Sequence, residues 1–128
     1  MRHVLLPGGE DEEHDHDHAG EGHSHEYDPH VWLSPERAIQ MVQNITKQLA
    51  EAFPDRKETF EKNAKAYIEK LTALHNDYTN AFKDAKQKNF VTQHTAFRYL
   101  ALDYGLNQVG ITGISPEAEP SAARLAEL

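Results

Sequence analysis

Apolar residues recur at every third or fourth position over two long stretches of the chain, and this spacing predicts two helices. The first begins at Ser34-Pro35-Glu36, where Ser is expected at the N-cap and Pro at the first helical position. Pro54 ends this helix, and Asp55 is expected to cap the next one. The apolar positions of the first helix are Ile39, Met41, Val42, Ile45, Leu49 and Phe53.

The second helical stretch is unusually long. No Gly or Pro interrupts residues 56–85, so one helix of about 30 residues and roughly 45 Å is expected. A helix longer than a small domain is wide usually joins two bodies or packs along one side of a large one. Its apolar positions are Phe60, Ala64, Tyr67, Leu71, Leu74, Tyr78 and Phe82.

The remaining segments predict strands around a shorter helix. A strand at residues 90–92, a helical stripe at 96–104 and a strand at 109–111 suggest a parallel strand–helix–strand crossover. Gly105 is expected just after the helix end, and a further helix starts near Ala122. At the N-terminus, Val4-Leu5-Leu6 reads as a strand before a Pro-Gly-Gly turn. The fold class is therefore α/β with a dominant long helix.

Charge is concentrated in one short segment. The net charge is −8, and eight of the 21 acidic residues lie in residues 10–26, which contain no Lys or Arg. The other 13 acids balance the 13 bases. This distribution gives no basic surface for nucleic acid and no polybasic patch for a membrane. Residues 10–26 also lack large apolar side chains, so we expect a flexible loop in the absence of metal.

Histidines in this loop alternate with acids, which indicates metal binding. The chain has no cysteine, so a transition-metal site must use His, Asp and Glu, and zinc accepts these ligands. The alternative is a cloning tag or an inert linker, but tags are normally consecutive histidines at a terminus, whereas these histidines are internal and alternate with acids. Affinity should be moderate because each ion must order the loop. The loop histidines are His14, His16, His18, His23 and His25.

Two further histidines stand at places suited to ligands. His30 lies between Pro29 and Pro35, and a buried Trp32 would lock its ring. His94 follows a predicted strand, at the end where open α/β sheets place ligand residues. On local sequence alone, a packing role for either histidine is equally consistent. His75 has no partner at ligand spacing and is expected to be structural or exposed.

Enzymatic signals are weak. The sequence contains no His-Glu-x-x-His motif, no glycine-rich phosphate loop and no Gly-x-Ser-x-Gly elbow. Ser115 and Ser121 have no neighbouring base in the sequence that would activate a nucleophile. We therefore expect no enzyme, and a metal-dependent hydrolase is the least favoured reading.

Three ordered motifs resemble the zinc-type metal solute-binding proteins of ABC transporters, an adhesin-related lipoprotein family. They are Asp28-Pro-His-Val-Trp-Leu-Ser-Pro35, Val91-Thr-Gln-His-Thr-Ala-Phe97 with Tyr99 and Tyr104-Gly-Leu106, and Gly113-Ile-Ser-Pro-Glu-Ala-Glu-Pro-Ser121. The resemblance implies two α/β lobes joined by a long rigid helix, with Zn²⁺ between them. His30 and His94 would be ligands converging across the ends of that rod. Manganese members carry a carboxylate at the position of His94, so this histidine favours zinc.

The resemblance also implies that the two-lobed fold is incomplete in this chain. Further ligands, an upstream His and a downstream carboxylate, are expected outside it, as is the export signal of an extracytoplasmic protein. Uncovered apolar faces would then favour self-association. The implied parts are the end of a first-lobe strand (1–9), the His-rich loop (10–26), the end of the first lobe (27–54), the linker helix (55–88) and the start of the second lobe (89–128).

The implied function is capture of zinc and its delivery to a membrane ABC permease. Two alternatives stay open. One is a zinc buffer or storage module that acts through the loop alone, and deletion of residues 10–26 would separate the two. The other is a surface adhesin in which metal only stabilises the fold.

Overall fold

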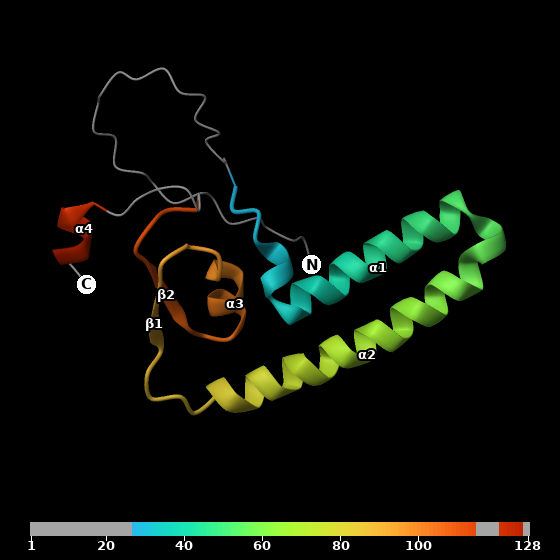
Figure 1. Ribbon diagram of the computed structural model, residues 1–128. Coiled ribbons are helices and arrows are strands. Elements are labelled where there is room, and N and C mark those ends of the chain that lie inside the picture. Colours follow the sequence, from blue (N-terminus) through green and yellow to red (C-terminus); the bar gives the residue numbers. More distant parts are fainter. Residues whose placement is uncertain (1–26, 115–120, 127–128) are drawn as a thin grey trace, which may run out of the picture.

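A computed structural model describes residues 27–114 and 121–126 of the 128-residue chain (Figure 1). Three segments singled out by the sequence lie outside the described residues. These are the predicted strand at Val4-Leu5-Leu6, the acidic His-rich loop 10–26, and residues 115–120 of the third motif.

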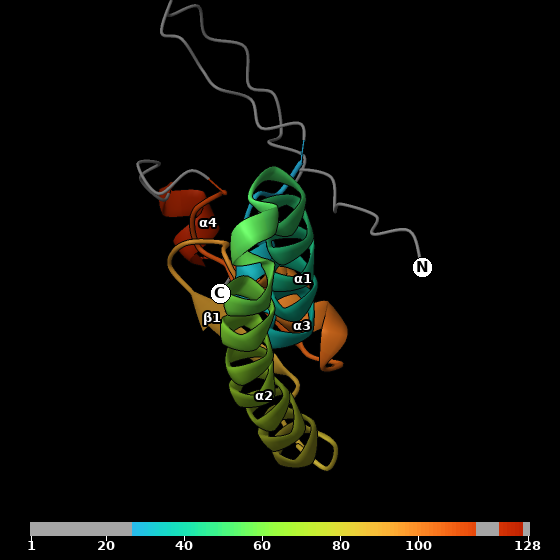
Figure 2. The ribbon, with the colours of Figure 1, turned by 90° about the vertical axis from the view of Figure 1, so that its right-hand side faces the viewer.

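Two helices form an antiparallel hairpin, an arrangement that the apolar spacing of each helix allows but did not predict. Helix α1 spans Pro35–Ala52, a 3₁₀ turn spans Pro54–Arg56, and α2 spans Lys57–Phe82. The two helices lie side by side in both views (Figures 1 and 2), and α2 returns the chain to the end where α1 began. The long helix therefore packs along α1 for much of its length.

Helix α1 begins at Pro35 after the predicted N-cap and ends before Pro54, as expected, but the capping contacts and the ends of α2 differ from the predicted ones. Ser34 occupies the N-cap of α1, but its side chain makes no capping bond. Asp55 does not cap α2, because it lies within the Pro54–Arg56 turn and Arg56 is the N-cap residue. Helix α2 stops at Phe82, three residues before Ala85. The Phe82 carbonyl accepts hydrogen bonds from Ala85 N at 3.2 Å and Lys88 Nζ at 2.7 Å, which closes the helix in a turn.

The strand–helix–strand unit is confirmed as parallel. Strand β1 (Asn89–Thr92) pairs in parallel with β2 (Asn107–Gly110), and helix α3 (Arg98–Asp103) connects them. Helix α3 ends as predicted, with Gly105 at φ +66° and Leu106 N donating to Ala101 O at 2.8 Å. Strand β2 begins and ends slightly earlier than the predicted 109–111. Helix α4 covers Ala122–Ala126.

An aromatic cluster joins the hairpin to this unit. Tyr104 is buried, and its ring lies 5.5 Å from that of Tyr78 and 6.2 Å from that of Phe82. Its hydroxyl lies 3.0 Å from His75 Nδ1, so His75 has the structural role expected of it. Burial is the main cause that raises the pKa of Tyr104 to about 12.

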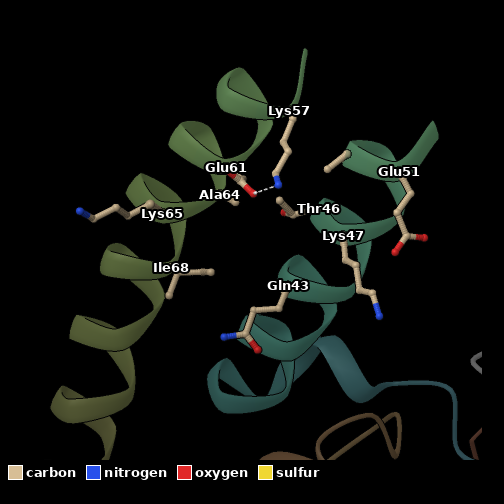
Figure 3. Close-up of a pocket in the computed structure, with 10 residues that line it drawn as sticks. Gln43, Thr46, Lys47, Glu51, Lys57, Glu61, Ala64, Lys65 and Ile68 are labelled. Atoms are coloured by element: carbon tan, nitrogen blue, oxygen red, sulfur yellow. Dashed lines mark ion pairs between the residues drawn. The ribbon is translucent and has the colours of Figure 1, made fainter. Parts of the chain in front are cut away.

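The hairpin of α1 and α2 carries both apolar and charged side chains on its exposed surface. Ile45 on α1 and Phe53 directly after it are 54% and 55% exposed. An open groove between α1 and α2 is lined by residues that include Lys47, Glu51 and Ile68, with no histidine among them (Figure 3). None of the helices in the described part of the chain is both long enough and apolar enough to cross a membrane.

Candidate metal centre

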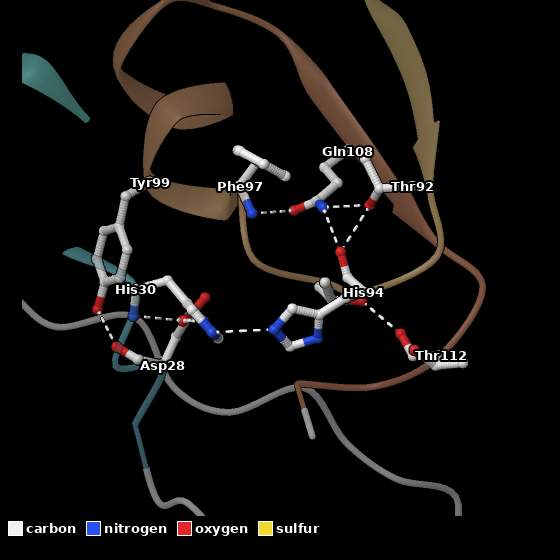
Figure 4. Close-up of polar contacts among 9 residues, drawn as sticks. Asp28, His30, Thr92, His94, Phe97, Tyr99, Gln108 and Thr112 are labelled. Atoms are coloured by element: carbon white, nitrogen blue, oxygen red, sulfur yellow. Dashed lines mark hydrogen bonds and ion pairs between the residues drawn. The ribbon is translucent and has the colours of Figure 1, made fainter. Parts of the chain in front are cut away.

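His30 and His94 lie together although they are 64 positions apart in the sequence (Figure 4). Their Nε2 atoms are 3.1 Å apart, and their rings meet edge to face with centroids 4.8 Å apart. His30 comes directly before the 3₁₀ turn Val31–Leu33 that leads into α1, and His94 follows β1. The helical hairpin brings these two segments back to one place.

This arrangement corrects one detail of the expected geometry. The two imidazoles do not meet across the ends of a single helical rod. The chain runs out along α1 and back along α2 (Figure 1), and His30 and His94 come just before and just after this hairpin in the sequence. The reason is the turn at Pro54–Arg56, which reverses the chain between the two helices.

A buried carboxylate holds the His30 ring. Asp28 is 0% exposed, and its Oδ1 accepts a hydrogen bond from His30 N at 3.0 Å and lies 2.7 Å from His30 Nδ1. A carboxylate on one ring nitrogen fixes the orientation of an imidazole and leaves the other nitrogen for a metal. Sequence reasoning missed this role of Asp28. The available signal was a carboxylate two positions before a candidate ligand.

The backbone at His94 is held from the neighbouring strand. The His94 carbonyl accepts hydrogen bonds from Thr92 Oγ1 at 2.8 Å and Gln108 Nε2 at 3.3 Å (Figure 4). Gln108 Oε1 in turn accepts a bond from Phe97 N at 2.9 Å. Among the described residues, no hydrogen-bond partner stands at the buried His94 Nδ1. The loop between β1 and α3 is therefore fixed on its backbone, and the ring projects toward His30.

Trp32 does not lock His30 by burial, as the sequence had suggested. Its side chain is 52% exposed, because the 3₁₀ turn directs it outward, and its ring centroid lies 5.6 Å from that of His30. Burial around the site comes instead from Tyr99, which is 0% exposed and whose hydroxyl donates to the Asp28 carbonyl at 2.8 Å. Tyr99 belongs to the motif that carries the family resemblance, but its contact with Asp28 was not predicted from the sequence.

The spacing of the two nitrogens suits a shared metal ion. With Zn–N bonds of about 2.0–2.1 Å, two ligands of a tetrahedral zinc lie roughly 3.3 Å apart, close to the 3.1 Å found here. Within residues 27–114 and 121–126, no group of three or more His, Asp or Glu side chains gathers to hold a metal. The described residues thus offer two nitrogen ligands and one orienting carboxylate. The histidines of the acidic loop, His14, His16, His18, His23 and His25, lie outside them.

Comparison with known proteins gives one family match over nearly the whole chain. The profile of the family described as "ZnuA: Zinc-uptake complex component A periplasmic" matches residues 2–128. The chain is 69% identical over 125 residues to the zinc-binding lipoprotein AdcA of Streptococcus pneumoniae serotype 4. That alignment covers 98% of this chain and 25% of AdcA, so the chain spans about a quarter of the length of this relative.

Two further similarities agree with this match. The high-affinity zinc uptake system protein ZnuA of Bacillus subtilis is 57% identical over 124 residues, which are 97% of this chain and 39% of ZnuA. Among solved structures, Zn(II)-bound AdcA from Streptococcus pneumoniae superposes with a TM-score of 0.74 at 60% identity, covering 98% of this chain and 24% of that one. The α/β fold of the chain therefore matches a part of the larger structure of Zn(II)-bound AdcA.

Proposed function

This chain belongs to the ZnuA family of periplasmic zinc-uptake components, and from that membership we propose that it captures Zn²⁺ for delivery to a membrane permease of the ABC type. The names of its relatives support an extracytoplasmic place, since they are described as lipoproteins or periplasmic components. The mechanism is reversible binding and handover, and it requires no chemical step.

The observation that carries the proposal is the 3.1 Å distance between the Nε2 atoms of His30 and His94. We propose that both atoms bind one zinc ion. Neutral imidazole nitrogens suit zinc, and the bond between His30 Nδ1 and Asp28 leaves Nε2 as the metal-binding atom. A closed zinc site has four ligands, so the remaining ones come from outside the described residues or from water.

The acidic loop has a supporting role in this proposal. His14, His16, His18, His23 and His25, with the acids between them, gather zinc from solution near the two-histidine site. Local negative charge raises the concentration of cations, and the loop imidazoles offer transient ligands. The loop therefore speeds capture, while His30 and His94 set the affinity of the final site.

We propose the following division of the described elements between two lobes. We assign residues 27–54, which include α1, to the end of a first lobe, and residues 55–88, which include α2, to the linker helix. Residues 89–128, with the parallel strands, begin the second lobe. In this assignment His30 and His94 belong to different lobes, so the ion would be held between them.

A zinc titration of the full chain and of single variants tests the proposal. His30→Ala and His94→Ala should each lower the affinity of the tightest site by at least about tenfold, because each removes a direct ligand. His75→Gln is the matched control, since His75 binds Tyr104 and lies outside the pair. Isothermal titration calorimetry gives the affinity, and circular dichroism checks that each variant is folded.

Deletion of residues 10–26 separates this function from a buffer that works through the loop. The proposal expects one zinc site to survive the deletion and then to disappear with His30→Ala. Loss of all zinc binding on deletion of the loop would show that His30 and His94 do not hold the ion, and would overturn the proposal.

A further inference from the structure

Three side-chain links join the two segments that carry the imidazoles. Asp103, the last residue of α3, accepts hydrogen bonds from Ser34 Oγ at 2.6 Å and from Arg37 Nε and Nη2 at 2.7 and 2.8 Å. Ser34 and Arg37 lie at the start of α1, just after His30, whereas α3 begins shortly after His94. These links therefore connect residues that are 66 and 69 positions apart in the chain.

The geometry of this cluster is more restrictive than that of an ordinary surface ion pair. Arg37 binds both oxygens of Asp103, and two parallel bonds fix the relative orientation of the two groups. The side chains are only 16% and 11% exposed, so water screens the pair weakly. The guanidinium also lies over the Tyr99 ring, with Arg37 Cζ 4.7 Å from the ring centroid. The hydrogen bond to Asp103 raises the pKa of Arg37 above its ordinary value.

The side chain of Ser34 also bonds to α3 and not to its own helix. A serine at an N-cap normally bonds to its own helix, a contact worth about 1 kcal/mol. Here the hydroxyl makes no capping bond, is fully buried and donates to Asp103 instead. The start of α1 is thus tied to the end of α3 at the expense of a local stabilising contact.

We propose that the cluster of Ser34, Arg37 and Asp103 is a clamp that sets the distance between His30 and His94, and that Asp103 is its central positioning residue. This inference rests on the proposed zinc site. A metal requires its ligand nitrogens in place to within a few tenths of an ångström, and supporting contacts usually provide that accuracy. The clamp supplies it by joining the two backbone segments that carry the rings.

Zinc and cobalt titrations of the full chain test the clamp. Trp32 is the sole tryptophan and lies 5.6 Å from the His30 ring, so its fluorescence reports on zinc at this site. Asp103→Asn should weaken zinc binding by about tenfold. It should also change the visible absorption of bound Co²⁺, which depends on ligand geometry. Ser34→Ala, which removes one of the three bonds, should act in the same direction by a smaller factor.

Two further variants separate positioning from a general loss of stability. Exchange of the pair, Arg37→Asp with Asp103→Arg, should restore most of the zinc affinity and the parental Co²⁺ spectrum. Glu61→Gln is the matched control, because it breaks the exposed Lys57–Glu61 pair of 3.7 Å (Figure 3). This pair lies in the first turns of α2, at the opposite end of that helix from the segment that carries His94, and its loss should change neither reading.

The possible outcomes distinguish the clamp from the zinc site itself. Unchanged zinc affinity and Co²⁺ absorption in Asp103→Asn and Ser34→Ala would overturn the clamp, while dependence on His30 would leave the zinc site standing. A folded exchange variant that binds no better than Asp103→Asn would also overturn it. If Asp103→Asn does not fold, Ser34→Ala decides the matter alone. An unchanged zinc affinity in His30→Ala would overturn the proposed function and, with it, the clamp.

Discussion

At the scale of single residues, the buried carboxylate of Asp28 orients the imidazole of His30. Asp28 is fully buried. Removing a charged carboxylate from water costs free energy unless hydrogen bonds offset the lost hydration. Its Oδ1 contacts both the backbone N and the ring Nδ1 of His30, and the hydroxyl of Tyr99 holds its carbonyl. Asp28 thus fixes the direction in which His30 presents Nε2.

Replacement of this carboxylate should weaken zinc binding more than it disturbs the fold. Asp28→Asn keeps the shape but removes the charge that favours a proton on Nδ1, so we expect about tenfold lower zinc affinity. Competition with a chromogenic chelator measures the change. Asp77→Asn, on the exposed face of α2, is the control. Equal affinities in the two variants would contradict the orienting role.

What the sequence could reveal at this scale depended on local signals. His30 and His94 stood out because each occupies a restricted position next to an element end, yet a packing role was equally consistent until their distance was known. Asp28 was missed because an acid two positions from a histidine is common. The expected burial of Trp32 was wrong, because its exposure depends on the direction of the 3₁₀ turn at Val31–Leu33.

At the scale of elements, the end of β2 supports the loop that carries His94. A Cβ on Gly110 would overlap Thr95 Oγ1, and that hydroxyl is held because it donates to Thr112 O at 2.6 Å. Only glycine allows this close approach of strand and loop. The loop between β1 and α3 therefore has little freedom to shift along the sheet.

Substitution at this contact should lower both stability and zinc affinity. Gly110→Ala is expected to cost about 1–3 kcal/mol of unfolding free energy and to displace Thr95 next to His94. Gly105→Ala is the matched control. Its Cβ would meet nothing within 4 Å, so only its φ of +66° costs stability, about 1 kcal/mol, and zinc binding should stay unchanged. Urea unfolding and zinc titration measure the two effects. Equal zinc affinity in the two folded variants would contradict the account.

The elements themselves were largely predictable, but their ends and partners were not. Periodicity identified α1 and α2 because their apolar residues recur at helical spacing, and short apolar runs identified the parallel strands. The end of α2 was missed because Lys88 closes it from beyond the helix by binding the Phe82 carbonyl. The hairpin could not be inferred, because an apolar stripe is equally satisfied by a neighbouring helix or by a separate lobe.

At the scale of the whole molecule, a helical hairpin is followed by a parallel strand–helix–strand unit (Figure 1). His30 and His94, from the segments just before and just after the hairpin, lie together. The chain spans about a quarter of the length of its AdcA relative. Apolar side chains such as Ile45 on α1 and Phe53 directly after it remain more than half exposed. Self-association of this chain through that face stays a prediction.

The central claim is that His30 and His94 bind one zinc ion through Nε2. Long-range ¹H–¹⁵N spectra of the imidazole rings, recorded with ¹⁵N-labelled histidine during a zinc titration at neutral pH, test it most directly. We predict that the Nε2 signals of both residues move together to metal-bound values at the same zinc equivalent, while His30 Nδ1 stays protonated against Asp28. Movement of only one of the two, or saturation at different zinc equivalents, would contradict the account.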